Sequence, residues 1–447
     1  MVLTNEIKRY KLFFTLKKFL TVVVILLSVL KNKNFLFLFW GRFVTNIGDS
    51  IYSVASMWLV FELTKSSFYT GIAGALILLP SMFEFLVGPL VDKWKLKSIM
   101  VYTQLLQAIL ISLVPISYFL GFLNVWLVII VMFLATCIEQ IVYPAQQSAI
   151  PKILENKDLV SGNSLMTFAY QGTDIILIGI SGLLISYLGA INIFIINVFT
   201  FIVACLLFRS LKLSQAEKQK KLEENTFKFK INEYLKELNL GRKFIMNSII
   251  PKIIFPLAIV NFIFGMITAI MPEFSLNIGG EKYYGYFLAT MSIAMLVGAL
   301  LSNFFSKYPL GLFTIIGFLI SSVAWFLSYW IQSPVFTVLF FGLAFIPISS
   351  VNILITSTLQ GLIPEDMIGK VFAWYSSITA LFVPIGSFIG GTLASTIGID
   401  NIYGLGSVAL LSISVYWLSH PIMRKIPQQM NIKADDYGLS NQKNFQK

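Results

Sequence analysis

The sequence predicts an all-α membrane protein with twelve transmembrane helices in two pseudo-symmetric six-helix bundles. Of its 447 residues, 57% are hydrophobic and 12% are charged, which leaves too little polar surface for a soluble globular protein. Apolar runs of about 20 residues recur along the chain, and each is long enough to cross a bilayer as a helix. The basic residues gather in alternate loops, as in proteins whose membrane orientation they fix. The net charge of +12 therefore reflects topology and does not indicate nucleic-acid binding.

Residues 1–34 precede the first predicted span. A cluster of lysine and arginine between Lys8 and Lys18 leads into the apolar run Phe19–Leu30. This run is too short for an ordinary span, which needs about 20 residues, and it lacks the small-residue cleavage site of a signal peptide. We expect a basic amphipathic segment on the inner membrane surface. A true start codon downstream of Met1 is the alternative.

The remaining apolar runs fall into two sets of six. Residues 35–209 are expected to form an N-terminal bundle and residues 253–420 a C-terminal bundle, joined by the linker 210–252 and followed by the tail 421–447. Part of the linker has apolar residues at helical spacing between Ile231 and Leu238, which predicts a surface helix. The predicted spans are 35–61, 70–91, 98–119, 125–147, 162–188, 191–209, 253–275, 284–305, 310–331, 334–358, 369–396 and 402–420.

The orientation follows from the basic residues outside the spans. Lys65 and Lys282 lie in loops on one side of the predicted membrane, and the other loop and terminal lysines and arginines lie on the opposite side. Because cytoplasmic loops carry the excess of lysine and arginine, we expect both termini and the linker to be cytoplasmic. The expected location is the cell membrane, as a multi-pass protein.

An internal repeat relates the two sets of spans. Gly88-Pro-Leu-Val-Asp ends the second predicted helix, and Gly298-Ala-Leu-Leu-Ser ends the eighth. Gln147-Ser-Ala-Ile-Pro follows the fourth helix, and Gln360-Gly-Leu-Ile-Pro follows the tenth. Two matches about 210 residues apart indicate a duplicated six-helix unit, and such duplications place a binding site at the interface between the repeats.

The residue inventory argues against an enzyme. His420 is the single histidine, and Cys137 and Cys205 both lie inside apolar helices, so we expect no catalytic residues, metal or cofactor. No phosphate-binding loop of the P-loop type is present, so ATP is not expected to drive the protein directly. The duplication instead predicts two bundles that rearrange around a central cavity, driven by an ion gradient or by the gradient of the substrate.

Charged residues inside the predicted spans are the candidates for coupling, since each costs roughly 2.5–3.5 kcal/mol at the bilayer centre and should face the protein interior. Arg42, Asn46 and Asp49 recur at spacings of four and three residues, so they share one face of the first helix. Arg42 and Glu84 lie at similar depths on neighbouring helices, which predicts an intramembrane ion pair. A permanent clamp between two helices is the structural alternative to a functional role for this pair.

Three carboxyl groups are candidates for proton coupling or substrate contact: Asp49, Glu139 and Asp174. Asp174 lies near the predicted midplane of the fifth helix, with no basic residue expected at its depth. Desolvation favours the protonated form of such a lone carboxyl, which is the property that a proton carrier needs. The alternative for each of the three is a hydrogen-bonded packing role. Glu273 lies close to the outer end of its helix and is expected at the interface.

The loop between the second and third predicted helices reads Gly88-Pro-Leu-Val-Asp-Lys-Trp-Lys-Leu-Lys-Ser. The order Gly-x-Leu-x-Asp followed by basic residues resembles the signature loop of the major facilitator superfamily. The resemblance implies the major facilitator fold, with Gly88, Asp92 and Lys93 in a cytoplasmic gate. It also implies that Asp92 interacts near the N-terminus of the eleventh helix, around Gly369–Lys370.

Further segments are similar to one branch of that superfamily, the macrolide-efflux-like drug:proton antiporters. They are the segment 34–51 in the first helix, Tyr143-Pro-Ala-Gln-Gln-Ser-Ala-Ile-Pro after the fourth, and Ile363-Pro-Glu-Asp-Met-Ile-Gly-Lys-Val-Phe before the eleventh. This resemblance implies a secondary active transporter that exports an amphipathic or lipophilic small molecule by proton antiport with alternating access. The phenotype that it implies is multidrug or macrolide resistance.

The expected partners are a small-molecule substrate, protons and membrane lipids, with no nucleic acid, and the expected state is a monomer. A siderophore or lysolipid exporter and an uptake symporter are the alternatives within the same fold. A non-transporting membrane sensor or scaffold is the alternative from a different class. The many phenylalanines of the spans, with Trp58, Trp325 and Trp374, could line a cavity for a lipophilic molecule or could serve packing alone.

Overall fold

The computed structural model describes residues 29–83, 95–155, 158–212, 239–331 and 333–439, and these residues form helices and connecting turns without a strand. Within this described part, ten helices are long and apolar enough to cross a membrane. They are α5 (Leu96–Phe119), α6 (Val125–Ile153), α8 (Thr173–Leu188) with the turns that precede it, α9 (Ala190–Arg209), α11 (Ile250–Gly279), α12 (Glu281–Phe305), α13 (Leu310–Trp330), α14 (Pro334–Leu362), α15 (Glu365–Ile397) and α16 (Ile399–Ser419).

The first two predicted spans differ from these ten. Helix α2 (Lys33–Thr64) has 32 residues but is less apolar, since its polar face carries Arg42, Asn46 and Asp49. Helix α3 (Ser67–Leu78) continues into the 3-10 turn η1 (Leu79–Phe83), where the described part of the second span ends. An all-helical membrane protein is therefore confirmed, and the count of twelve spans stays a prediction.

Several sequence predictions fall on residues outside the described ranges. These are the amphipathic segment at the N-terminus, most of the linker with its predicted surface helix, and the gate loop. Glu84, Gly88, Asp92 and Lys93 belong to this group, so the predicted gate motif and the predicted partner of Arg42 both stay predictions.

Local sequence explains where the helices begin and turn. The side chain of Asn32 accepts hydrogen bonds from the first backbone N–H groups of α2, and Asn124 does the same for α6. Gly189, Gly280 and Gly398 each end one helix and start the next, with φ of +77°, +96° and +85°. These φ values favour glycine because it has no Cβ.

Two of these glycines support the duplication that the sequence predicts. Gly189 joins α8 to α9, and Gly398 joins α15 to α16, in corresponding places about 210 residues apart. Their backbone angles are nearly the same, with ψ of 152° and 149°. The fifth-to-sixth and eleventh-to-twelfth predicted spans are thus connected by the same one-residue turn.

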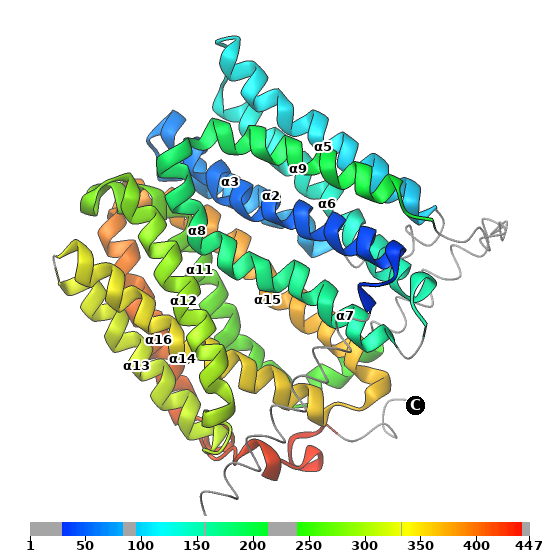
Figure 1. The fold of residues 1–447 in the computed structure, drawn as a ribbon. Coiled ribbons are helices and arrows are strands. Elements are labelled where there is room, and N and C mark those ends of the chain that lie inside the picture. Colours follow the sequence, from blue (N-terminus) through cyan, green and yellow to red (C-terminus); the bar gives the residue numbers. More distant parts are fainter. Residues whose placement is uncertain (1–28, 84–94, 156–157, 213–238, 332, 440–447) are drawn as a thin grey trace, which may run out of the picture.

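The helices pack as two sets (Figure 1). In the first set, α2 packs against α8 and α9, and α5 packs against α6 and α9. In the second set, α11 packs against α15 and α16, while α14 packs against α12 and α13. The start of α2 lies beside the end of α9, because Asn34 donates to the carbonyl of Lys212 at 3.0 Å. We call this end of the molecule, from which the linker leaves, the linker side, and the opposite end the far side.

The two sets meet mainly where α8 packs against α12 and α3 packs against α15. A Cβ added to Gly182 would stand 2.1 Å from the Cα of Gly285, so the backbones of α8 and α12 touch at this point. Ser387 on α15 donates to the carbonyl of Gly71 on α3 at 3.2 Å. Gly71 and Gly285 lie in the first turns of helices that start at the far side, so the two sets are joined near that end.

Residues 421–439 form an ordered strap under the linker side of the second set. The first backbone N–H groups of α13, those of Leu310 and Gly311, donate to the carbonyls of Pro427 and Ile426, both at 3.1 Å. Ile249, just before α11, donates to the carbonyl of Tyr437 at 3.1 Å. The strap therefore satisfies donors that helix starts leave unpaired.

Candidate functional site

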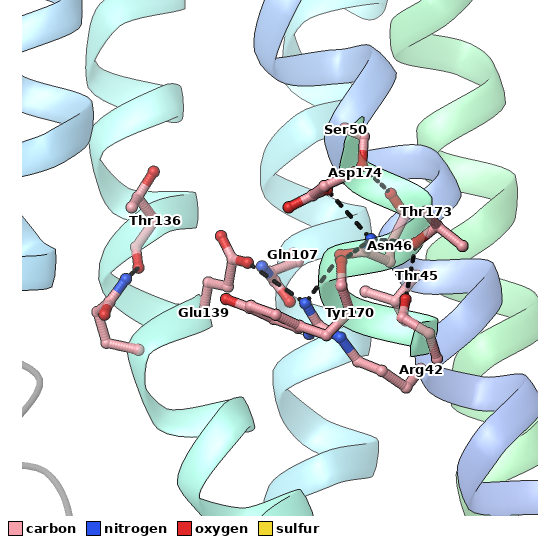
Figure 2. Close-up of polar contacts among 12 residues, drawn as sticks. Arg42, Thr45, Asn46, Ser50, Gln107, Thr136, Glu139, Tyr170, Thr173 and Asp174 are labelled. Atoms are coloured by element: carbon pink, nitrogen blue, oxygen red, sulfur yellow. Dashed lines mark hydrogen bonds and ion pairs between the residues drawn. The ribbon is translucent and has the colours of Figure 1, made fainter. Parts of the chain in front are cut away.

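Arg42 on α2 is the centre of a polar cluster inside the first set of helices (Figure 2). Its side chain is 1% exposed. Its Nη2 lies 3.9 Å from Oε1 of Glu139 on α6 and donates to Oδ1 of Asn46 at 3.0 Å. The guanidinium carbon also stands 4.1 Å from the ring centroid of Tyr170. A buried cation thus has a carboxylate, an amide oxygen and an aromatic face around it, which offsets part of its desolvation cost.

Asn46, one turn further along α2, connects this cation to the fifth predicted span. Its Nδ2 lies 2.8 Å from the carbonyl oxygen of Tyr170, 2.6 Å from Oγ1 of Thr173 and 3.1 Å from Oδ1 of Asp174. Its side chain is 2% exposed. Because buried amides persist only when they are hydrogen-bonded, Asn46 fixes the rotation of α2 against α8.

Asp174 lies in the first turn of α8 and is half-buried. Ser50 on α2 contacts the same carboxyl oxygen, Oδ1, that faces Asn46. The helix that leads into this position is not regular: the five residues Phe168–Gly172 form a π-helical turn between α7 (Leu159–Thr167) and α8. Such turns occur frequently at functional sites, and this one carries the Tyr170 carbonyl that bonds Asn46.

A ladder of neutral side chains continues from this cluster into α5 and α6. Thr45 on α2 contacts Oε1 of Gln104 at 2.8 Å, Gln104 donates to Gln107 at 3.3 Å, and Gln107 donates to the carbonyl of Ala135 at 3.3 Å. Gln104 and Gln107 are fully buried, at 0% and 2% exposed. Buried amides inside an apolar bundle are costly without partners, so this ladder ties the three helices into one polar core.

Asp49 and Glu139 both line a polar cavity of about 220 Å³ within the first set. Its other walls include Tyr52, Gln107 and Tyr170. Oδ2 of Asp49 and the hydroxyl of Tyr52 are buried, and neither makes a hydrogen bond to the described residues. Buried polar atoms of this kind are usually satisfied by ordered water, and the cavity is large enough to hold several water molecules.

An apolar cavity of about 380 Å³ lies between the two sets. The first set contributes residues of α2, α3 and α8, and the second set contributes residues of α11, α12, α14 and α15. Its walls are dominated by large apolar and aromatic side chains, among them Met57, Met271, Tyr284, Phe287 and Phe345. Ser53, Ile77 and Leu78 line both cavities, so the polar and the apolar space share a wall.

A third cavity, of about 410 Å³, lies at the far side around Asp400 and Trp330. All its lining residues come from the second set of helices and their connections. A passage between two rearranging halves must be lined by both of them, so the cavity between the sets fits a substrate site better than this larger one does.

The structure therefore brings together three acids that the sequence singled out. Asp49, Glu139 and Asp174 all belong to the cluster around Arg42 or to the cavity beside it, although they come from three different helices. The carboxylate beside Arg42 is Glu139, which is 30% exposed. The roles of these residues, and the predicted contact of Arg42 with Glu84, stay predictions.

Sequence reasoning missed the neutral members of the site. Asn46 was placed on the polar face of α2, but Ser50, Thr173 and the glutamines of α5 carried no prediction. Ser50 follows Asp49 directly and stands one turn after Asn46, so helical spacing could have added it to the polar face. The sequence contains no comparable indication for the glutamines of α5, because a glutamine in an apolar span predicts a buried side chain but does not show which residue it bonds.

The comparisons with known proteins agree with this architecture. A family model described as Major Facilitator Superfamily matches residues 38–387. The chain is 22% identical over 427 residues to YkuC, an uncharacterized MFS-type transporter of Bacillus subtilis strain 168, covering 91% of this chain and 97% of YkuC. It is 24% identical over 399 residues to macrolide efflux protein A of Streptococcus pyogenes, covering 84% and 93%.

Among solved structures, the peptide transporter POT in complex with sulfate aligns with a TM-score of 0.60. The alignment covers 89% of this chain and 96% of that one, at 14% identity. At this identity the likeness concerns the fold alone. With a family model that spans most of the chain, a helical fold shared over nearly its full length and a cavity between two sets of helices, this chain belongs to the Major Facilitator Superfamily and is a multi-pass membrane transporter.

Proposed function

We propose that this transporter exports an amphipathic or lipophilic small molecule across the cell membrane in exchange for protons, by alternating access. The observation that carries the proposal is the shared wall between an apolar cavity and a polar cavity that holds Asp49 and Glu139. The apolar space suits the body of a lipophilic compound. The adjacent acids suit a proton that binds and leaves within the same conformational cycle.

The proposed cycle moves the bundle 35–209 against the bundle 253–420, with the linker and both termini in the cytoplasm. Support for this movement comes from the far-side location of the contacts between the sets, at Gly71–Ser387 and Gly182–Gly285. Contacts concentrated at one end allow the other end to separate. The similarity to macrolide efflux protein A favours a bulky substrate.

The entry of one proton per transport cycle releases enough free energy to drive the proposed export. A hundredfold gradient of a neutral compound requires about 2.7 kcal/mol, at roughly 1.4 kcal/mol per decade. One elementary charge that crosses about 150 mV releases roughly 3.5 kcal/mol, before any pH gradient is counted.

The test is transport by the purified full chain in proteoliposomes with an imposed pH gradient. The panel contains a macrolide, a lipophilic dye, a lysolipid and a siderophore, and both substrate flux and counter-flow of protons are recorded. We expect proton-driven movement of the macrolide or dye in the antiport direction. The triple variant D49N/E139Q/D174N should abolish it, whereas Glu62→Gln, an exposed acid at the end of α2, should leave it unchanged.

Symport in place of antiport would overturn the proposed direction. Flux that is the same with and without the pH gradient would overturn proton coupling. Transport of the lysolipid or siderophore alone would replace the substrate class while leaving the mechanism in place.

A further inference from the structure

Tyr52 on α2 has a buried hydroxyl in the wall of the polar cavity. Its side chain is 8% exposed, and its ring packs edge-on against Phe194 of α9 with the ring centroids 5.1 Å apart. The hydroxyl makes no hydrogen bond to the described residues. A phenylalanine would give the same ring packing without a buried polar atom that lacks a partner, so packing alone does not account for a tyrosine here.

The polar groups around this hydroxyl bond elsewhere. Ser56, one turn further along α2, donates to the backbone carbonyl of Tyr52 at 2.7 Å and does not bond the phenol. Three other side chains that line the cavity donate to backbone carbonyls, at 3.3, 3.0 and 3.5 Å: Gln107, Thr136 and Gln140. Oδ2 of Asp49 is also buried without a hydrogen bond to the described residues. Asp49 and Tyr52 lie one helical turn apart, so two open polar atoms line the same cavity.

The neighbouring apolar cavity offers a polar group much less. Among the described residues that line it, three carry a hydroxyl: Ser53, Thr268 and Tyr284. Ser53 donates to the carbonyl of Ser50 at 2.9 Å, and Thr268 donates to the carbonyl of Phe264 at 2.8 Å. Their hydrogens are therefore used within their own helices. Tyr284 is the alternative partner for a polar group.

The sizes of the two cavities favour a ligand that occupies both. The apolar cavity has a volume of about 380 Å³, which is near the lower end of the range of roughly 300–1,000 Å³ for pockets that bind drug-sized molecules. Where the cavities share a wall, the side chains of Ser53, Ile77 and Leu78 separate them. A molecule whose apolar body fills the first cavity can therefore extend a polar end past these side chains into the second.

We propose that the transported compound carries a hydroxyl or amino group at one end of its apolar body, and that Tyr52 determines specificity by binding this group. Both head groups have a hydrogen to donate, and the phenol oxygen of Tyr52 and the carboxyl oxygen of Asp49 can accept it. An analogue without the head group leaves these buried atoms unpaired, which is how a polar site discriminates between similar ligands. The proposal rests on the proposed function, because it places the body of the substrate in the cavity between the sets.

The test uses three probes that share a pyrene body: 1-pyrenemethanol, 1-pyrenemethylamine and 1-methylpyrene. Binding to the purified full chain is measured by energy transfer from tryptophan to pyrene. Tyr52→Phe removes the hydroxyl and keeps the ring. We expect this variant to bind the alcohol and the amine about tenfold more weakly, as for a hydrogen bond lost from a buried group, and to bind 1-methylpyrene as the wild type does. A loss for one head group alone supports the proposal and narrows the substrate class to that group.

Tyr187→Phe is the matched control, because Tyr187 is 81% exposed at the end of α8 and lines neither cavity. It should leave all three affinities unchanged. An equal loss for all three probes in Tyr52→Phe would indicate a structural role for the hydroxyl and overturn the proposal. A loss for the alcohol and amine in Tyr284→Phe in place of Tyr52→Phe would also overturn it.

The binding measurement is independent of transport, so the two proposals can fail separately. Proteoliposomes may be loaded with 1-pyrenemethanol or 1-pyrenemethylamine and given a pH gradient. If neither probe moved in response to the gradient although Tyr52→Phe lowered their affinities selectively, proton-driven export would be overturned and the binding role of Tyr52 would stand.

Discussion

Glu273 on α11 accepts hydrogen bonds from both the backbone N–H and the hydroxyl of Ser67 on α3. The backbone bond is 3.0 Å long and crosses from the second set of helices to the first. Ser66, the residue in the N-cap position of α3, makes no side-chain cap of its own. A carboxylate from the other half of the molecule therefore caps the start of this helix, where negative charge is favoured.

This cross-set cap should help to hold the far side closed. Replacing Glu273 with Ala removes it, at a cost of about 0.5–2 kcal/mol on the scale of helix caps. We expect the far-side ends of α3 and α11 to separate more often, which can be measured as a longer distance distribution between spin labels at the exposed positions Phe68 and Leu276. Ser66→Ala should leave the distribution as it is. The same distances in Glu273→Ala and wild type would show that the cap is not part of the closure.

The contact between Gly182 and Gly285 should not tolerate a side chain. The Cβ of Gly182→Ala would stand 2.1 Å from a backbone atom, which cannot rotate away as a flexible side chain can. We expect α8 and α12 to move apart and the protein to lose about 1–3 kcal/mol of stability, as for other overpacked sites. Thermal unfolding in detergent measures this loss.

Gly361→Ala is the control for that substitution, because nothing lies within 4 Å of a Cβ at this position of α14. Alanine in place of a helical glycine should leave the unfolding temperature unchanged or raise it. Equal unfolding temperatures for the Gly182 and Gly361 variants would contradict a close backbone contact between the sets.

Removing the charge of Arg42 should destabilise the first set of helices. Arg42→Gln leaves the carboxylate of Glu139 without the cation beside it, and we expect a loss of about 3 kcal/mol, the lower end for a broken buried pair. Glu139→Gln should cost less, since Glu139 is 30% exposed and partly screened by solvent. The double variant should be more stable than the sum of the two losses predicts, as measured by unfolding in detergent.

Arg209, an exposed residue at the end of α9, is the control position for the Arg42 and Glu139 substitutions. Its replacement by Gln should change stability by less than about 0.5 kcal/mol, as for most surface positions. Strict additivity of the Arg42 and Glu139 substitutions would argue that the two side chains do not stabilise one another.

Filling the apolar cavity between the two sets should weaken substrate binding. Met271 lines this cavity and is 5% exposed, so Met271→Trp places an indole in the space between the sets. We expect at least about tenfold weaker binding of a lipophilic dye, or about 1.4 kcal/mol. Fluorescence titration measures the affinity.

Leu300→Trp on α12 provides the matched control, since Leu300 is 81% exposed on the outer face of its helix. It adds the same indole where lipid would meet it. If Met271→Trp bound the dye as tightly as Leu300→Trp does, the cavity between the sets would not be the binding site.

The sequence alone determined where the helices lie. The ten long apolar helices each overlap a span predicted from an apolar run, and the turns at Gly189 and Gly398 fall between the predicted spans. The physical reason is local: in a bilayer every backbone group must bond within its own segment, so an apolar run of sufficient length becomes a helix whatever surrounds it. The repeat and the motifs indicated the family for the same reason, because they are read along the chain.

The tertiary structure decided which faces of these helices meet. Depth along the first helix made Glu84 a reasonable partner for Arg42, but only the packed bundle shows that Glu139 faces it. The position of Glu273 along its helix predicted only that it lies near the membrane–water interface. The structure shows that its carboxylate accepts a hydrogen bond from the backbone N–H of Ser67. Depth follows from a rise of about 1.5 Å per residue, but the rotation of each helix about its axis depends on the small and polar residues of every neighbour together.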